Sequence, residues 1–418
     1  MKAATAVATG GTLLVMRALV FSLVVAASMP AYADEAARKV TLAEVIAAAS
    51  QTPAMRVPQH EAAAADALAG AAGAWPNPAI RIETNRLTAR LVAGATVPVP
   101  VFGTVRAVRR TAAAQAEVVR GDAIVATRAV HRRAVTAWIA LARADADVAT
   151  AAIVATQATA LERIAVGRFD AGTSGNVDVT AAKAARARAE LAVATAKRTR
   201  EAASAELAAM IGWDPMQPLE AVGDLPGRES LALAALQARL AGHPDRVVAL
   251  RKVAAADASL AEVRSLRWPS LALDAQVSAY DPTQPGVDVL VGLAIELPIF
   301  AHVGARVRAA RATGSVERAR LAVAETQLAG GLVAAYRRWQ SASEQLAGLE
   351  RDIVPAQEQA AVLSQQAYRE GARDLASALQ ADRDLAAVRA EVIATRSDVA
   401  TAWLALLEAA GEDFTRAR

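Results

Sequence analysis

The apolar positions of this chain follow two spacings, a helical one over most of its length and an alternating one in two short stretches. The clearest helical stretch follows a turn that carries Gly172 and ends at Gly212, just before Asp214-Pro215. A Gly inside a helix costs about 1 kcal/mol and a Pro about 3 kcal/mol, whereas Gly followed by Pro is a common helix end. The pattern therefore predicts one long helix with both ends marked.

Very long helices are predicted in both halves of the chain. No proline occurs between Val101 and Asp214, so we expect a helix from about 104 to 166, a turn at 167–175 and a return helix to Met210. At ~1.5 Å per residue each arm is on the order of 60 to 90 Å long. Near the C-terminus a heptad seam, typical of helices packed side by side, comprises Leu385, Val388, Val392, Val399, Trp403 and Leu406.

Alternating apolar and small or polar residues predict strands at 271–299, where Leu271, Leu273 and Val277 lie on one face. A shorter pair is expected at 79–101. This alternation fits a membrane barrel, and it also fits a half-buried hairpin of a soluble protein. Periodicity alone does not choose between them.

The chain is organised as two copies of one unit. Gly172 and Gly212 are 40 positions apart, and so are Gly371 and Gly411. We therefore predict a first repeat at 34–215 with a helical hairpin at 104–211, a linker at 216–229, and a second repeat at 230–418 with a hairpin at 303–410. Within the first repeat, Thr41-Leu-Ala-Glu44 is a capping box that starts a helix, and Pro53 and Pro58 are expected to interrupt it.

The N-terminus has the features of a secretory signal peptide. Residues 1–33 carry Lys2 and Arg17 but no acid, followed by an apolar run and Ala31-Tyr-Ala33. The run is shorter than the ~20 residues that span a bilayer, so we expect cleavage after Ala33. Met16 is an alternative start.

Composition excludes several classes of function. The 46 basic and 42 acidic residues nearly balance, which disfavours a nucleic-acid partner. Cys is absent, and the four histidines, His60, His131, His243 and His302, have no metal-binding spacing. No nucleophile lies near a base and no phosphate loop occurs, so we expect neither enzyme activity, nor a cofactor, nor a metal site.

The ordered set of motifs resembles the TolC-like outer-membrane efflux channels, most closely the CzcC-like branch that serves heavy-metal pumps. The resemblance rests on Trp75-Pro-Asn-Pro78, Gly167-Arg-Phe-Asp-Ala-Gly172, Gly242-His-Pro244, Arg267-Trp-Pro-Ser270, Leu297-Pro-Ile-Phe300 and Tyr368-Arg-Glu-Gly371. It implies a mainly α fold with a small β part. The duplicated hairpins would form a trimeric α-barrel, and four strands per chain would join a shared transmembrane β-barrel.

The resemblance also implies partners and sites. The partners are two further copies of the chain, outer-membrane lipid, a periplasmic adaptor and an inner-membrane pump of the RND type, and the cargo is divalent metal cations. The turns between the long helices would contact the adaptor through Arg168, Phe169, Asp170, Gly172, Thr173 and Ser174 and through Tyr368, Arg369, Glu370 and Gly371. We expect Asp170 and Glu370 to form an acidic constriction, although the same acids could simply be solvated.

Two other functions stay open at this stage. The chain could be a soluble periplasmic helical scaffold, in which the strands are ordinary hairpins, or an adaptor, which usually has one helical hairpin between β-rich domains. Drugs or other small molecules are the alternative cargo.

Overall fold

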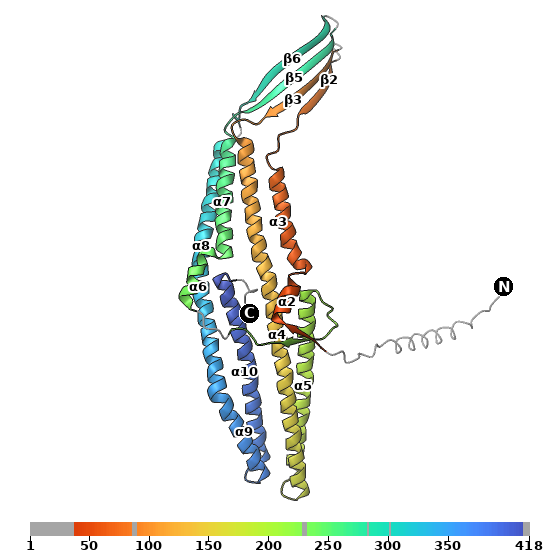
Figure 1. Ribbon diagram of the computed structural model, residues 1–418, viewed down its shortest axis with the longest axis vertical. Coiled ribbons are helices and arrows are strands. Elements are labelled where there is room, and N and C mark those ends of the chain that lie inside the picture. The colour runs from red at the N-terminus through yellow and green to blue at the C-terminus, as the bar shows by residue number, and fades with distance from the viewer. Residues whose placement is uncertain (1–36, 86–89, 228–231, 282–283, 301, 413–418) are drawn as a thin grey trace, which may run out of the picture.

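The chain is a long rod with a β-sheet at one end and two helical turns at the other (Figure 1). This computed structural model describes residues 37–85, 90–227, 232–281, 284–300 and 302–412. The predicted signal peptide therefore lies outside the described residues.

The first hairpin consists of α4, Thr104–Asp170, and α5, Asn176–Ile211. With 67 residues, α4 is about 100 Å long, and it runs from the foot of the sheet to the far end of the rod (Figure 1). Its Ala-rich sequence has high helix propensity, and the absence of Pro leaves every backbone N–H available to the helix. The two long helices are those predicted, but α4 continues to Asp170, past the predicted end at 166.

The second hairpin pairs α10, Leu375–Ala410, with a helix that changes pitch in its middle. That helix comprises α8, Val303–Gly348, a π-helical turn η2, Leu349–Ile353, and α9, Val354–Arg369. Pro355 cannot donate a backbone hydrogen bond, and a π-turn is one of the ways a helix accommodates such a gap. The helix thus continues through Pro355.

Shorter helices flank the long ones. They are α2, Leu42–Ala49; α3, Pro53–Ala71; α6, Leu233–Arg239; the 3-10 turn η1, Leu240–Gly242; and α7, Pro244–Ser265. The capping box before α2 is present, with both Thr41 and Glu44 accepting from the other's backbone N–H. The prediction that Pro58 interrupts the helix is wrong. Pro53 occupies the first turn, where Pro is favoured, and Pro58 is buried inside α3, so packing offsets the lost hydrogen bond.

A small parallel sheet occupies the segment predicted as a linker. β1, Arg38–Thr41, pairs with β4, Leu219–Val222. The segment predicted as a linker, 216–229, thus contains a four-residue strand that the sequence analysis did not predict. Each strand is too short to form alone, and their pairing joins segments about 180 positions apart that local sequence does not connect.

The larger sheet is antiparallel, with the strand order β2-β3-β5-β6. Its strands are β2, Ala79–Asn85; β3, Arg90–Val99; β5, Ser270–Asp281; and β6, Gln284–Glu296. The strands end earlier than the predicted limits of 101 and 299. Three-residue turns follow them, in which the Val101 N–H donates to Val99 O at 2.9 Å and the Ile299 N–H to Leu297 O at 2.8 Å.

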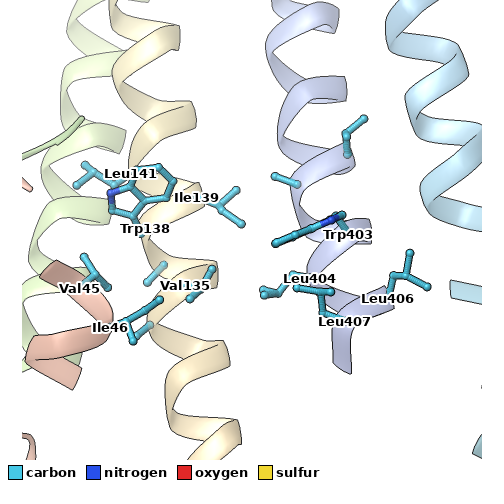
Figure 2. Packing of buried hydrophobic residues seen from close by; sticks show 14 of the residues in the cluster. Val45, Ile46, Val135, Trp138, Ile139, Leu141, Trp403, Leu404, Leu406 and Leu407 are labelled. Atoms are coloured by element: carbon cyan, nitrogen blue, oxygen red, sulfur yellow. The ribbon is translucent and has the colours of Figure 1, made fainter. Parts of the chain in front are cut away.

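The main core lies halfway along the rod, where α2, α4, α5, α8 and α10 meet. Figure 2 shows Trp138 and Leu141 of α4 beside Val45 of α2, with Trp403 and Leu406 of α10 in the same cluster. The Trp138 indole donates to the Val40 carbonyl oxygen at 3.2 Å, and the Trp339 indole donates to that of Gly227 at 2.9 Å. Five of the six heptad positions predicted in α10 are buried and the sixth, Val388, is half-buried, which confirms the seam.

Candidate functional site: the hairpin tips and the sheet

The two hairpin tips lie at the same end of the rod, opposite the sheet (Figure 1). Arg168, Phe169 and Asp170 form the last turn of α4, and Gly172, Thr173 and Ser174 lie in the reversal before α5. In the second tip, Tyr368 and Arg369 end α9, with Glu370 and Gly371 in the reversal before α10. The fold thus brings the two predicted groups together at one end.

Both tips use the same helix cap. Gly172 and Gly371 have φ values of +72° and +81°, a left-handed conformation that favours glycine. The N–H of Gly172 donates to Phe169 O and that of Thr173 to Arg168 O, both at 2.9 Å. The second tip has the same Schellman pattern. There the Gly371 N–H donates to Tyr368 O and the Ala372 N–H donates to Ala367 O.

Arg168 and Tyr368 join the two tips. The Arg168 guanidinium donates to the Tyr368 carbonyl oxygen and lies over its ring, 4.7 Å from the centroid. The fully buried Tyr368 ring packs in a small cluster with Leu161 and Ala165 of α4, Ala182 of α5, and Leu375 and Ala378 of α10. The sequence analysis named Arg168 and Tyr368 separately but did not predict that they touch.

The environment of Tyr368 changes its ionisation. Burial raises the pKa of the phenol, and the negative charge of Asp178 raises it further, while Arg168 acts in the opposite direction. Asp178, in the first turn of α5, thus acts electrostatically on Tyr368, which its place in the sequence, eight residues after Asp170, did not reveal.

Asp170 and Glu370 are both exposed. Glu370 accepts a hydrogen bond from Gln366 Nε2 at 2.9 Å, a contact along its own helix. Phe169 is 44% exposed and Val177 is 81% exposed. The tips therefore present acids and apolar side chains to the outside around a buried Arg–Tyr contact.

The four-stranded sheet has two chemically different faces. One face carries aliphatic side chains that are 42–78% exposed, among them Ile80, Ile82, Leu273, Val277, Val289, Val291, Leu293 and Ile295. The pairing of Leu273 with Leu293 and of Val277 with Val289 aligns them across strands. The other face carries Arg81 and Glu83, which form an ion pair at 3.3 Å, and a Thr96–Asp274 hydrogen bond.

The described residues contain no group of three or more His, Asp or Glu side chains that could hold a metal ion. His243 is instead the cap of α7, since Nδ1 accepts from the Asp245 N–H at 3.2 Å and Nε2 lies 3.0 Å from Glu408 O. Within the same part of the chain, the structure has no helix both long and apolar enough to span a membrane.

Sequence comparison relates the chain to efflux proteins. Residues 235–412 match the family model "Outer membrane efflux protein". The outer membrane efflux protein BepC of Brucella suis biovar 1 (strain 1330) is 27% identical over 259 residues, which cover 60% of this chain and 56% of BepC. The match thus spans little more than half the length of that relative.

Solved structures share the fold along most of the chain. VceC of Vibrio cholerae superposes with a TM-score of 0.75 at 18% identity, covering 89% of this chain and 96% of that one. The outer-membrane channel OprN gives 0.76 at 20% identity, with 90% of each chain covered. CusC superposes with a TM-score of 0.77 at 16% identity, covering 89% of this chain and 92% of CusC. These are outer-membrane proteins and channels, not enzymes, and the mainly α fold with a small sheet is theirs.

Proposed function

We propose that this chain, which has the fold of the outer membrane efflux channels and matches their family model over residues 235–412, is a passive export conduit in the outer membrane. It would form the outermost part of a tripartite efflux system. The observation that carries the proposal is the exposed aliphatic face of the four-stranded sheet, with a polar face behind it. Such a sheet suits lipid on one side and water on the other.

A single chain cannot complete such a structure. The strand order leaves β2 and β6 as open edges, and unpaired strand edges are not tolerated in lipid. β5 and β6 have 12 and 13 residues, enough for the ~9–11 residues that cross a bilayer. We therefore propose that three copies join β2 of one chain to β6 of the next. The helices would form a continuous tunnel on the other side of the membrane, and residues 1–33 would direct export.

The tips would form the mouth that meets a periplasmic adaptor and, through it, an inner-membrane pump of the RND type. Their exposed Phe169, Arg369 and Gly371 would supply contacts, and Asp170 and Glu370 from three chains would make an acidic ring that favours cations. Divalent heavy-metal cations are the proposed cargo, passed without being held, because a conduit needs no ligand cluster. Drugs are the alternative cargo.

Membrane fractionation and gel migration test the conduit. The expressed protein should require detergent for extraction from the outer membrane and should migrate as a trimer until it is boiled. A soluble periplasmic monomer would refute the channel and support a helical scaffold or an adaptor instead.

Single-channel recording tests the acidic ring separately. In planar bilayers, the Asp170→Asn/Glu370→Gln double variant should lose cation preference while still forming channels. The Asp374→Asn variant changes an acid that caps α10 near the same tip, so it controls for charge alone. Unchanged selectivity in the double variant would remove the ring from the proposal.

A further inference from the structure

The ends of the long helices that meet the sheet carry an unusual excess of positive charge. The first nine residues of α4 and of α8 each contain three arginines, which are Arg106, Arg109 and Arg110 in α4 and Arg306, Arg308 and Arg311 in α8. The end of α7 and the turn after it add Arg264 and Arg267. All eight, called here the arginine collar, are exposed. In residues 104–112, 260–267 and 303–311, which carry them, the single acid is Glu262.

Contacts within the described chain do not neutralise the collar. Among the described residues, no carboxylate forms an ion pair with a collar arginine, and Glu296, at the end of β6, accepts from Ser270 Oγ at 3.0 Å. Two to three turns further from the sheet, the same helices pair their charges. Arg120 contacts Asp66 at 2.8 Å, Lys252 contacts Asp122 at 3.4 Å, and Arg318 contacts Asp257 at 2.6 Å.

The collar arginines of α4 and α8 also occupy positions that are electrostatically unfavourable in a helix. The N-terminus of a helix carries partial positive charge and favours acids, yet the first turns of α4 and α8 contain no acid. Arg106 and Arg110 are four positions apart, and Arg308 and Arg311 three, so like charges share a helix face. These placements are unfavourable within the chain, and a negatively charged partner would offset them.

Aromatic side chains mark the same level of the molecule. Trp75, Trp268 and Phe300 are 65%, 58% and 89% exposed, and Phe102 stacks on Trp268 with ring centroids 5.4 Å apart. In sequence, Trp75 lies between α3 and β2, Phe102 between β3 and α4, Trp268 between α7 and β5, and Phe300 between β6 and α8, so all four belong to connections between the sheet and the helices. Exposed Trp and other aromatic residues are typical of the boundary between hydrocarbon and headgroups.

We propose that the arginine collar binds the headgroups of anionic glycerophospholipids in the membrane leaflet that faces the helices. The proposal rests on the proposed function, because it requires the sheet to lie in the bilayer. The exposed aliphatic face would contact the acyl chains, and the aromatic residues would lie at the boundary between acyl chains and headgroups. The long arginine side chains would then reach the lipid phosphates on the helix side of that boundary.

Lipid retention measures this binding. The purified full-length protein is equilibrated in mixed micelles with equal amounts of phosphatidylglycerol and phosphatidylcholine, and the lipid that co-elutes with it is quantified by mass spectrometry. The wild type should enrich phosphatidylglycerol about tenfold, and Arg306→Gln/Arg308→Gln/Arg311→Gln should reduce this severalfold, because each arginine near anionic lipid contributes to attraction. The corresponding triple Lys variant should retain most of the enrichment.

A matched control removes three charges from α5, far from the sheet, in Arg188→Gln/Lys197→Gln/Arg198→Gln. It should retain wild-type enrichment, and replacing chloride by inorganic phosphate at equal ionic strength should not abolish it. No enrichment in the wild type, or equal loss in the control, would overturn the proposal.

Insertion into phosphatidylcholine vesicles is measured in parallel. Failure there refutes the membrane channel itself, whereas insertion without lipid preference refutes only the collar.

Discussion

At the scale of single residues, glycines and buried polar contacts determine where the long helices end and meet. Gly172, Gly212, Gly371 and Gly411 all have φ between +72° and +81°, and each closes a Schellman cap. A side chain in this conformation costs roughly 1–2 kcal/mol. The surroundings of each glycine then decide how much further a substitution costs.

We expect Gly411→Ala to destabilise the protein more than Gly172→Ala. A Cβ at Gly411 would lie 2.9 Å from His243 Cδ2, whereas at Gly172 nothing lies within 4 Å. Gly172→Ala should therefore lower the free energy of unfolding by about 1 kcal/mol, from backbone strain alone. Gly411→Ala should lower it by this amount and by the additional cost of the clash with His243. Thermal unfolding followed by circular dichroism in detergent measures both. Equal losses would show that the His243 contact relaxes freely.

Alkaline pH should destabilise the contact between the two tips, because it ionises Tyr368. Its pKa is raised by burial and by Asp178, so the folded state holds the phenolic proton more tightly than the unfolded chain does. The stability from this group is present below the unfolded pKa and is lost as pH rises through the folded one. Tyr368→Phe should flatten the fall in melting temperature above about pH 10. A slope identical to that of the wild type would contradict this.

At the scale of elements, one carboxylate connects three segments at mid-height. Asp145 of α4 accepts from Arg200 Nε of α5 at 2.5 Å and from the Ala221 N–H of β4 at 2.9 Å. Burial raises the pKa of Asp145, and its two donors oppose that rise. Stability from this group is therefore lost as pH rises through its folded pKa, so acid does not act against the fold through Asp145.

Removing this connection should separate β4 from the helices. We expect Asp145→Ala to cost about 2 kcal/mol, because it leaves a partly buried guanidinium and a backbone N–H without their acceptor. Asp147→Ala, two residues along the same helix, removes a contact to Arg143 at 3.9 Å and should cost less than about 1 kcal/mol. Thermal unfolding in detergent compares them, and similar losses would exclude a special role for Asp145.

At the scale of the whole molecule, the two faces of the sheet determine whether the protein can enter a membrane. Leu293 lies on the aliphatic face and Leu290 on the opposite one, both on β6 and 60% and 65% exposed. Leu293→Lys should therefore oppose insertion by about 2–4 kcal/mol, whereas Leu290→Lys should be tolerated in a polar interior. The yield of heat-sensitive trimer in the membrane fraction measures both. Equal yields would mean that the two faces do not differ in their contact with lipid.

Features that depend on neighbours along the chain could be predicted from the amino-acid sequence. Pro-free Ala-rich runs predict the long helices, and the glycines that follow them predict the helix ends. Period-two alternation predicts the strands. These signals can be found in sequence because propensity and capping act over a few residues. The division into repeats at 34–215 and 230–418 stays a prediction.

Features that depend on contacts between distant segments could be seen only in the folded chain. Arg168 meets Tyr368 across 200 positions, β1 pairs with β4 where a linker was predicted, and Pro58 is buried inside α3 rather than interrupting it. Each outcome depends on packing between segments that become neighbours only when the chain folds, and local propensity carries no record of such partners.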